Sequence, residues 1–349
     1  MKRLRPTLLC VIGIMFGCAA GGSLKPTGVV MYEPQSESAL IAGKAIALAY
    51  SGFRQGQHPD RGQGEVMPSV AEIEEDLRLL SEHGVDLIRL YDSGKLSERV
   101  LQTIETKSLP IKVVLGAWLR AEVSAHETCA WLNAPIPAST LEANREENKR
   151  ELERAISFAN RYRTAIVAVN VGNEALVTWN DHLVSIEAMV EYIGLVKSRI
   201  AQPVTTADNY LAWVEHGKRL MTVADFAFVH TYPVWEGKSL TESMDYTRAN
   251  LVMVRQALPT TAIAIGEAGW PSIASEFGER ASEENQAEYV SQLIAFAKAS
   301  NTTVFVFEAF DEDWKGNDDP NGAEKHWGLF NIDRTAKKGV QSGKLLPRR

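Results

Sequence analysis

The sequence AIAIGEAGWPS, residues 262–272, is an apolar run that ends in a carboxylate, a glycine, a tryptophan and a proline. The apolar residues predict a short strand. Ile263, Ile265 and Glu267 would share one side of it, because side chains alternate along a strand. A carboxylate in register with core-facing isoleucines costs free energy to bury, unless a partner satisfies it or a site uses it. Glu267 is therefore a candidate functional residue.

A second stretch repeats this pattern. The sequence AIVAVNVGNEAL, residues 165–176, is another apolar run that ends in a glutamate, Glu174. Either glutamate alone could pair with a buried arginine or lysine. Together they outline an active site with two carboxylates.

The rest of the chain alternates short apolar runs with helical patterns. Eight runs read as strands, at residues 45–50, 85–91, 111–115, 165–174, 204–207, 226–229, 262–267 and 303–307. Helical periodicity covers residues 69–84, 96–107, 142–162, 185–200, 243–258 and 282–300, and Ser69 with Glu72 forms a capping box at the first of these. No element is assigned between residues 208 and 225.

Strands that alternate with helices imply parallel, right-handed crossovers. Eight such units fit a single (β/α)8 barrel better than an open sheet, and no G-x-G-x-x-G follows the first strand. Active sites of this fold lie where the strands end. Polar and aromatic residues gather at those ends, namely Tyr50, Tyr91, Trp118, Glu174, His230, Tyr232, Glu267 and Glu308.

The N-terminus reads as a processing segment. Residues 1–17 combine a basic start with an apolar stretch too short to span a bilayer, which predicts a signal peptide of the lipoprotein type. The sequence MFGC, residues 15–18, resembles a bacterial lipobox with lipid attached to Cys18. The alternative is an ordinary signal peptide cut near Ala20 or Gly22. We expect an exported, membrane-anchored lipoprotein of the cell envelope, or else a soluble periplasmic or secreted protein.

Residues 18–43 are expected to be a tether and residues 44–340 a catalytic domain. The 349 residues are 45% hydrophobic with a net charge of -7 and no basic stripe, so no nucleic-acid partner is expected. The three cysteines give neither a disulfide framework nor zinc spacing, and Cys129 reads as a small buried hydrophobe. His230 has no second His or Cys at ligand spacing. We therefore expect no metal and no cofactor. The protein is expected to be a monomer.

In a barrel of eight parallel strands, the ends of the fourth and seventh face each other across the mouth. Two carboxyls about 5–5.5 Å apart permit double displacement at a sugar, with one as acid and the other as nucleophile. Burial and mutual repulsion would raise the pKa of the acid, so that it stays protonated near neutral pH.

Several motifs resemble those of glycoside hydrolase family 17, the β-1,3-glucanase family. They are VGNE at 171–174, IGEAGWPS at 265–272 with Ala268 where the family usually has Ser, FDEDWK at 310–315, EKHWGLFN at 324–331 and RLY at 89–91. The resemblance runs from about residue 45 to residue 333. It implies a barrel glycosidase with Glu174 as general acid/base and Glu267 as nucleophile.

The resemblance also implies binding residues. Asn173 would bond the sugar 2-hydroxyl, and since a regular strand sends Asn173 and Glu174 to opposite faces, a bulge or turn is expected there. Glu312, Lys315 and Glu324 match family positions near the site, although Lys315 and Glu312 could equally form a structural salt bridge. Glu308 is either a sugar contact or a structural pairing. The candidates for stacking on glucose, with core packing as the alternative, are Tyr91, Tyr232, Trp235 and Trp270.

The sequence thus favours a retaining glycosidase that cleaves β-1,3-glucan. A transglycosylase with the same two glutamates is the near alternative, decided by loops such as residues 54–64 and 120–141. A non-catalytic glucan-binding lipoprotein is the alternative of another class, and the presence of both glutamates argues against it.

Overall fold

The computed structural model describes residues 32–36, 41–60, 62 and 64–343. The expected signal peptide and Cys18 lie outside this part of the chain. Within it, eight parallel strands close into a barrel in the order β1 to β8, and β8 pairs with β1. Their bounds are Ile46–Ala49, Leu87–Arg89, Lys112–Ala117, Ile166–Asn173, Val204–Asn209, Ala227–His230, Ile263–Ala268 and Val304–Val306. The expected (β/α)8 barrel is confirmed.

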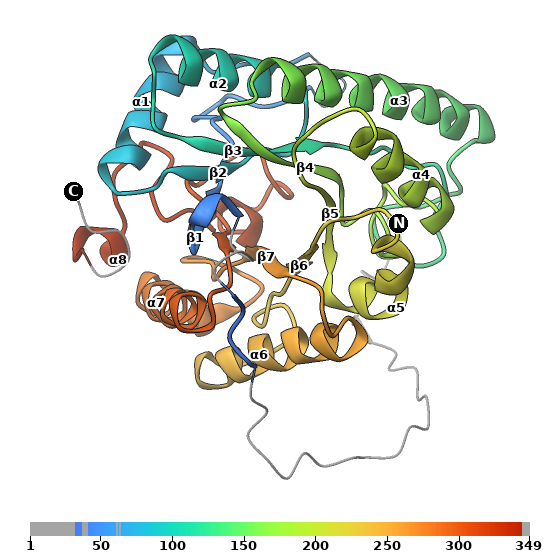
Figure 1. The fold of residues 1–349 in the computed structure, drawn as a ribbon. Helices are drawn as coiled ribbons and strands as arrows, with labels where there is room; N and C mark the ends of the chain where they lie inside the picture. The colour runs from blue at the N-terminus through green and yellow to red at the C-terminus, as the bar shows by residue number, and fades with distance from the viewer. Residues whose placement is uncertain (1–31, 37–40, 61, 63, 344–349) are drawn as a thin grey trace, which may run out of the picture. The chain divides into compact units, whose positions relative to one another are not determined.

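Helices surround the strands (Figure 1). The helices α1 to α8 cover Val70–Glu82, Lys95–Thr106, Ala138–Arg161, Ile186–Lys197, Tyr210–Leu220, Leu240–Ala257, Glu283–Ser300 and Lys338–Gln341. The capping box of Ser69 and Glu72 begins α1 as expected. Helix α5 was not expected. It follows β5 without a linker, because the side chain of Asn209 accepts a hydrogen bond from the backbone N–H of Leu211 and starts the helix at once.

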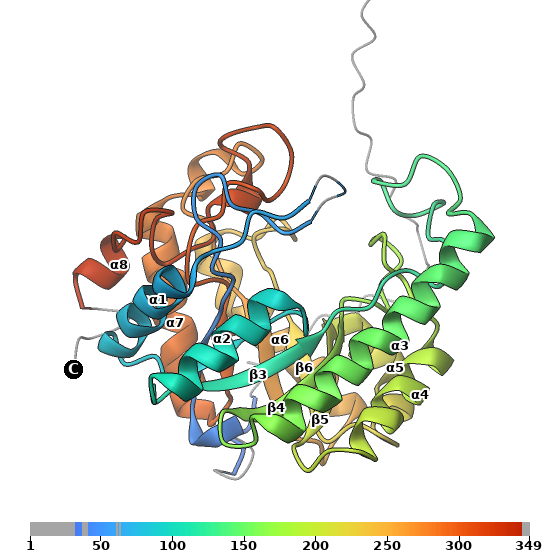
Figure 2. The same cartoon turned by 90° about the horizontal axis from the view of Figure 1, so that it is seen from above.

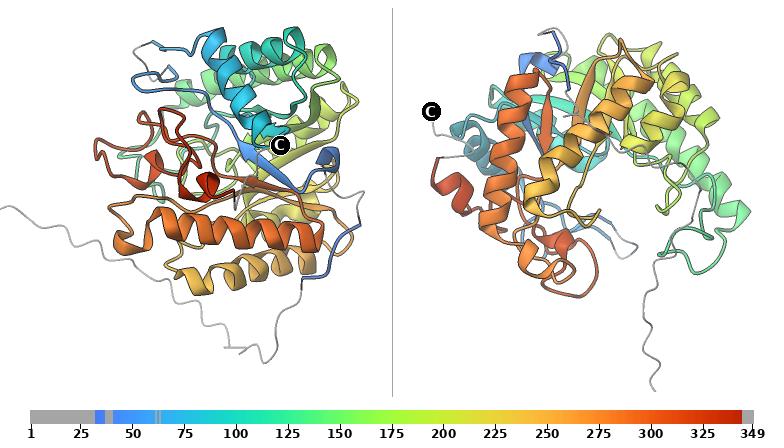
Figure 3. Two further views of the ribbon diagram at one scale, coloured as in Figure 1. Left: turned by 90° about the vertical axis from the view of Figure 1, so that its left-hand side faces the viewer. Right: turned by 90° about the horizontal axis from the view of Figure 1, so that it is seen from below.

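The apolar residues of the strands fall into two layers. Small and aromatic residues fill the inside of the barrel, among them Ala168, Ala207, Phe228, Ala264 and Phe305. The alternate residues pack outward against the helices. Helices α6 and α7 lie side by side in this outer layer (Figure 3).

Strand β7 corrects the expected placement of Glu267. Ile263 and Ile265 do not face the inside of the barrel; they belong to the outer layer, and Ala264 points inward. The register then shifts, so that Val229 pairs with Ile265 but His230 pairs with Glu267. This bulge breaks the two-residue alternation and turns Glu267 to the mouth of the barrel.

Strand β4 has an irregularity at the matching place, as expected. Its register with β5 shifts between Asn170 and Asn173, Gly172 has a φ of +78°, and Glu174 itself has a φ of +46°. Glycine adopts that backbone region readily, but a glutamate adopts it only where its surroundings hold it. The chain therefore turns at Glu174 instead of continuing as a strand.

The folded unit begins earlier than the expected boundary at residue 44. The side chain of Gln35 accepts a hydrogen bond from Ile263 N at 2.8 Å and donates one to Ile263 O at 2.8 Å. Its backbone N–H donates to Ser300 O, and Tyr32 is buried against Phe296. Residues 32–36 are thus part of the fold at the first residue of β7, opposite the strand ends that carry the glutamates.

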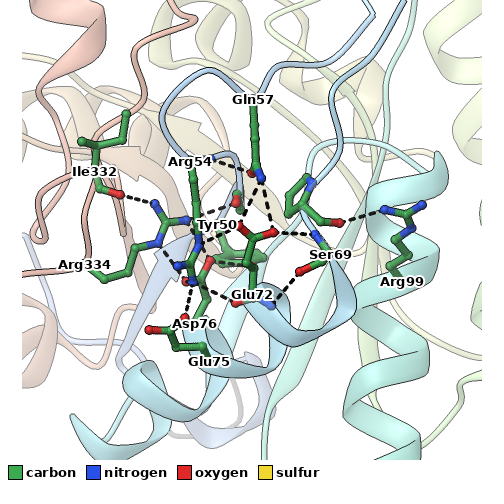
Figure 4. A network of polar contacts seen from close by, with 12 residues as sticks. Tyr50, Arg54, Gln57, Ser69, Glu72, Glu75, Asp76, Arg99, Ile332 and Arg334 are labelled. Carbon is green, nitrogen blue, oxygen red and sulfur yellow. Dashed lines mark hydrogen bonds and ion pairs between the residues drawn. The ribbon is translucent and has the colours of Figure 1, made fainter.

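Loops at the carboxyl ends of the strands extend beyond the barrel, and those after β1, β3 and β8 are the longest (Figure 2). The β1–α1 loop is tied down by a network centred on Asp76 of α1, which is fully buried (Figure 4). Arg334 donates to both carboxylate oxygens of Asp76, at 2.8 and 2.9 Å, and Arg54 donates to Oδ1 at 2.8 Å. This network joins the loop to α1 and to the C-terminal segment.

None of the helices that the structure describes is long and apolar enough to cross a membrane.

Candidate active site

Glu267 stands at the end of β7 with donors on both carboxylate oxygens. Arg89, at the end of β2, and the hydroxyl of Tyr91 each donate to Oε1 at 2.9 Å. The hydroxyl of Tyr232, after β6, donates to Oε2 at 2.7 Å. Burial, followed by the charge of Glu267, raises the pKa of both tyrosines, so both remain donors. The carboxylate is held rigidly in the orientation that these three groups impose.

His230 links the two glutamates. Its Nδ1 lies 3.0 Å from Oε1 of Glu174 and 3.5 Å from Oε2 of Glu267. Its Nε2 lies 3.0 Å from a guanidinium nitrogen of Arg89, which can only donate. Nε2 is therefore the acceptor, and Nδ1 carries the proton that is donated to Glu174.

The two carboxylates approach the same nitrogen atom, which limits their separation. Their nearest oxygens can be no more than about 6.5 Å apart. The two carboxyl groups are about 5–5.5 Å apart in retaining glycosidases, and the separations found in inverting glycosidases begin at about 6.5 Å. The pair is therefore close enough to act on one glycosidic bond.

Glu174 departs from expectation in its pKa. Burial raises it, but the hydrogen bonds from His230 and Asn180 lower it by more, so the pKa lies below that of an ordinary glutamate. Asn180 donates from one amide nitrogen to the backbone O of Glu174 at 3.1 Å and to Oε2 at 3.3 Å. The predicted rise was wrong because the sequence did not reveal these two donors.

Asn173, the last residue of β4, lies beside the pair. Its Oδ1 accepts a hydrogen bond from Arg89 at 2.5 Å, and its backbone O is 2.8 Å from Nε2 of His182. Arg89 therefore bonds Asn173, His230 and Glu267 at once and fixes the ends of β2, β4, β6 and β7 relative to one another.

A buried charge cluster follows β8. Lys315 Nζ lies 2.5 Å from Glu308 and 2.7 Å from Glu312. Glu312 is fully buried, and its Oε1 accepts from Ser51 and Trp314, so the structure favours the structural salt bridge for this residue. Burial lowers the pKa of Lys315, but the two carboxylates raise it by more, leaving it above the ordinary value.

Glu308 is 1% exposed, and its Oε1 has no hydrogen-bond partner in the described part of the chain. Burial raises its pKa well above the ordinary value. Glu324 is half-buried and lies within electrostatic range of both catalytic candidates. Burial raises its pKa most. The charge of Lys315 lowers this pKa, and the charges of Glu267 and Glu174 raise it further.

The four stacking candidates separate into two kinds. Tyr91 and Tyr232 are half-buried beside Glu267, and Trp235 is 45% exposed with its ring against Phe277. Trp270 is fully buried, packs on Tyr289 and donates to Arg280 O. It presents no face to a ligand, so Trp270 is a core residue and its expected stacking role is withdrawn.

Other residues near the pair were missed from the sequence or, like Trp118, were given no role. Arg89 was noticed only as part of the RLY motif, although an arginine inside an apolar strand is itself a signal. Trp118, after β3, stacks on His182 with the ring centroids 4.7 Å apart, and it is 36% exposed. Asn180 and His182 lie in a loop without periodicity, so nothing in the sequence distinguishes them.

Cys129 is buried and unpaired, in agreement with its reading as a small hydrophobe. Across residues 32–36, 41–60, 62 and 64–343, no group of three or more His, Cys, Asp or Glu side chains is arranged to hold a metal ion.

An eight-stranded parallel barrel with two adjacent carboxylates at the ends of β4 and β7 is the architecture of a barrel glycoside hydrolase. Residues 47–328 match the family described as the BtgE/BtgC glycoside hydrolase domain, and the chain belongs to that family. The resemblance to glycoside hydrolase family 17 is thereby confirmed.

Known proteins agree with this assignment. A glucan 1,3-beta-glucosidase of Schizosaccharomyces pombe is 30% identical over 182 residues, which are 49% of this chain and 56% of that relative. The alignment thus spans only about half of each protein.

Two solved structures have the same fold. An endo-laminarinase from Formosa Hel1_33_131 is 23% identical with a TM-score of 0.71, and the match covers 87% of this chain and 88% of that one. A glycoside hydrolase family 17 beta-1,3-glucanosyltransferase from Rhizomucor miehei is 21% identical with a TM-score of 0.66, covering 87% and 97%. An active-site mutant of the Rhizomucor miehei beta-1,3-glucanosyltransferase has been solved in complex with laminaritriose.

Proposed function

We propose that this protein is a retaining glycosidase that cleaves β-1,3-glucan by double displacement. The observation that carries the proposal is the meeting of Glu174 and Glu267 at one nitrogen of His230, at the carboxyl ends of β4 and β7. Membership of the BtgE/BtgC family and the names of the relatives support the substrate.

Glu267 is the nucleophile in this mechanism. Its carboxylate attacks the anomeric carbon while the bond to the leaving oxygen breaks, which gives a covalent glycosyl-enzyme. Arg89, Tyr91 and Tyr232 prevent rotation of the attacking carboxylate. Such fixed donors lower the cost of orienting the nucleophile at the moment of reaction.

Glu174 is the general acid and then the general base. In its protonated form it gives a proton to the leaving oxygen, and in its ionised form it takes one from the attacking water. Because the pKa of Glu174 is lowered in the free enzyme, its protonated form is present on the acidic side. His230 and Asn180 hold the two carboxylate oxygens in place between these steps.

Sugar contacts surround the pair in this proposal. Asn173 is next to the acid and bonds the 2-hydroxyl. Glu308 carries a buried oxygen without a partner in the described part of the chain, which suits it to accept from a sugar hydroxyl. Tyr91, Tyr232, Trp235, Lys315 and Glu324 are the further candidates for sugar contact. His230 is fully buried and would act through Glu174, and Glu312 would act through Lys315.

The near alternative is transfer of the glycosyl group to a second sugar. The similarity to a beta-1,3-glucanosyltransferase favours it as a second candidate. The chemistry up to the glycosyl-enzyme is the same, and the two reactions differ only in whether water or a sugar hydroxyl then attacks.

The location of the protein belongs to the same proposal. A lipid at Cys18 would anchor the exported enzyme to a membrane of the cell envelope, and the enzyme would act as a monomer. Mass spectrometry of the purified protein tests the anchor, since Cys18→Ser should remove a diacylglyceryl group.

Product analysis on laminari-oligosaccharides tests the function. We expect wild type to give shorter products, and Glu267→Ala and Glu174→Gln to give none. Products longer than the substrate, also absent from both variants, would assign the transferase. Binding of laminarin with neither shorter nor longer products would refute both enzymatic readings.

A further inference from the structure

Asp208 is a buried carboxylate that the proposed mechanism does not use. It is fully buried near the end of β5, and its neighbour Ala207 belongs to the inner layer of the barrel. Because side chains alternate along a strand, Asp208 points outward, beneath the loop that follows β4. A buried carboxylate is retained at a cost unless donors satisfy it.

One of its donors comes from the turn that carries Glu174. Oδ2 of Asp208 accepts from the backbone N–H of Leu176 at 2.9 Å, and Oδ1 accepts from that of Asn209 at 2.8 Å. Burial, followed by the charge of Glu174, raises the pKa of Asp208, while the backbone N–H groups of Leu176, Asn209 and Ala175 lower it. Asp208 therefore contacts both residues that directly follow Glu174.

Glu174 needs such an anchor because of its backbone conformation. Its φ of +46° is costly for a residue with a side chain, and it persists only where neighbours fix it. On the strand side, its N–H donates to Ala207 O at 2.8 Å. On the loop side, Asp208 holds the chain two residues later. The strained residue is thus clamped between two consecutive residues of β5.

We propose that Asp208 is a positioning residue for the acid/base step, which fixes the turn at residues 174–176 so that the Glu174 carboxyl reaches the glycosidic oxygen. This inference rests on the proposed role of Glu174. Without Asp208, the backbone N–H of Leu176 loses its acceptor and the turn can relax. A displacement of about 1 Å of a reacting group can lower a rate by roughly 100-fold.

The step through Glu174 can be separated from general damage to the fold. The 2,4-dinitrophenyl β-glycoside of laminaribiose loses its phenolate without a proton, so it forms the glycosyl-enzyme without an acid. Azide then attacks the anomeric carbon as the bond to Glu267 breaks, and it gives a glycosyl azide without a base. Azide therefore restores turnover only where the acid/base has failed.

The experiment compares Asp208→Ala and Asp208→Asn with Glu174→Ala and with Asp225→Ala. Asp225 is the matched control, because its Oδ2 accepts from Val204 N at 2.8 Å at the opposite end of the same strand. We expect Asp208→Ala to lose about 10- to 100-fold of its turnover on laminarihexaose. With the dinitrophenyl substrate, azide should raise its turnover several-fold and yield the glycosyl azide. Asp225→Ala should show neither effect.

Two results would overturn the proposal. One is a folded Asp208→Ala or Asp208→Asn protein that keeps at least half of the wild-type turnover. The other is a loss of turnover that azide does not restore, which would leave Asp208 a purely structural role. Thermal unfolding checks that each variant is folded. If Asp208→Ala does not fold, Asp208→Asn replaces it, because asparagine has nearly the same side-chain volume as aspartate. If Glu174→Ala is itself unimpaired, the proposed function fails; if only the Asp208 variants lack rescue, the positioning role fails.

Discussion

His230 Nδ1 lies 3.0 Å from Oε1 of Glu174 and 3.5 Å from Oε2 of Glu267, so one imidazole nitrogen faces both carboxylates. Arg89 bonds the opposite side of the ring at Nε2. The ring is fully buried and cannot turn without losing both contacts. His230 therefore connects the end of β4 to the end of β7 and influences the charge of the acid.

The first prediction concerns pH. His230 and Asn180 both lower the pKa of Glu174, and the hydrogen bond from His230 is the larger of the two. In the proposed mechanism Glu174 donates a proton, which is present below its pKa and lost above it. Removing either donor raises that pKa, so His230→Ala and Asn180→Ala should move the basic limb of kcat/KM to higher pH, with the larger shift in His230→Ala. The pH profile on laminarihexaose measures this, and a shift to lower pH would contradict it.

The second prediction concerns the nucleophile. Tyr232→Phe removes one hydrogen bond, of 2.7 Å, to Oε2 of Glu267. A hydrogen bond to a charged group contributes about 1.5–3 kcal/mol, so kcat/KM should fall roughly 10- to 100-fold. Tyr246→Phe is the control, since the hydroxyl of Tyr246 bonds only weakly, at 3.4 Å, to that of Tyr210. Equal kinetics for the two variants would show that Tyr232 does not orient Glu267.

The third prediction concerns stability. Asp76 is fully buried with Arg54 and Arg334, and replacing one member of such a network leaves an uncompensated buried charge. Asp76→Asn should lower the free energy of unfolding by about 3–5 kcal/mol. Glu75→Gln removes a pair from the same Arg54 at the surface, where the effect should be under about 1 kcal/mol. Urea unfolding of both variants measures the difference, and similar midpoints would contradict it.

The fourth prediction concerns the start of the domain. Gln35 makes two hydrogen bonds to the backbone of Ile263, one to Thr302 and one to Arg255. A protein that begins at residue 32 keeps all of these contacts. A protein that begins at residue 44 should be less stable by at least about 1–3 kcal/mol, because buried partners lose their hydrogen bonds. Equal stability of the two truncated proteins would restore the boundary at residue 44.

Periodicity was sufficient to predict the barrel, because each strand is a short apolar run and most are followed by a helical pattern. It also located Glu174 and Glu267, because a carboxylate at the end of an apolar strand is conspicuous. The faces of β7 were assigned wrongly. A strand packed on both sides has no polar face, so its sequence does not show which side chains point into the barrel. The bulge before Glu267 then reverses the alternation of side chains.

Contacts between distant parts of the chain explain the remaining differences. The donors that lower the pKa of Glu174 come from the end of β6 and from the β4–α4 loop, so the sequence around Glu174 holds no trace of them. Trp270 follows the nucleophile as closely as a ligand-binding residue would, and only the packing of α7 shows that it is buried. Asn209 starts a helix where no element was assigned, because it serves as the last residue of β5 and as the cap of α5.

The most direct measurement is to trap the covalent intermediate. A 2-deoxy-2-fluoro analogue of an activated laminaribioside should form a stable glycosyl-enzyme, since the fluorine slows both its formation and its breakdown, and the good leaving group restores the rate of formation alone. Peptide mass analysis should place one glycosyl group on Glu267 in wild type and none in Glu267→Ala. A label on another residue, or turnover of laminari-oligosaccharides by Glu267→Ala, would contradict the account.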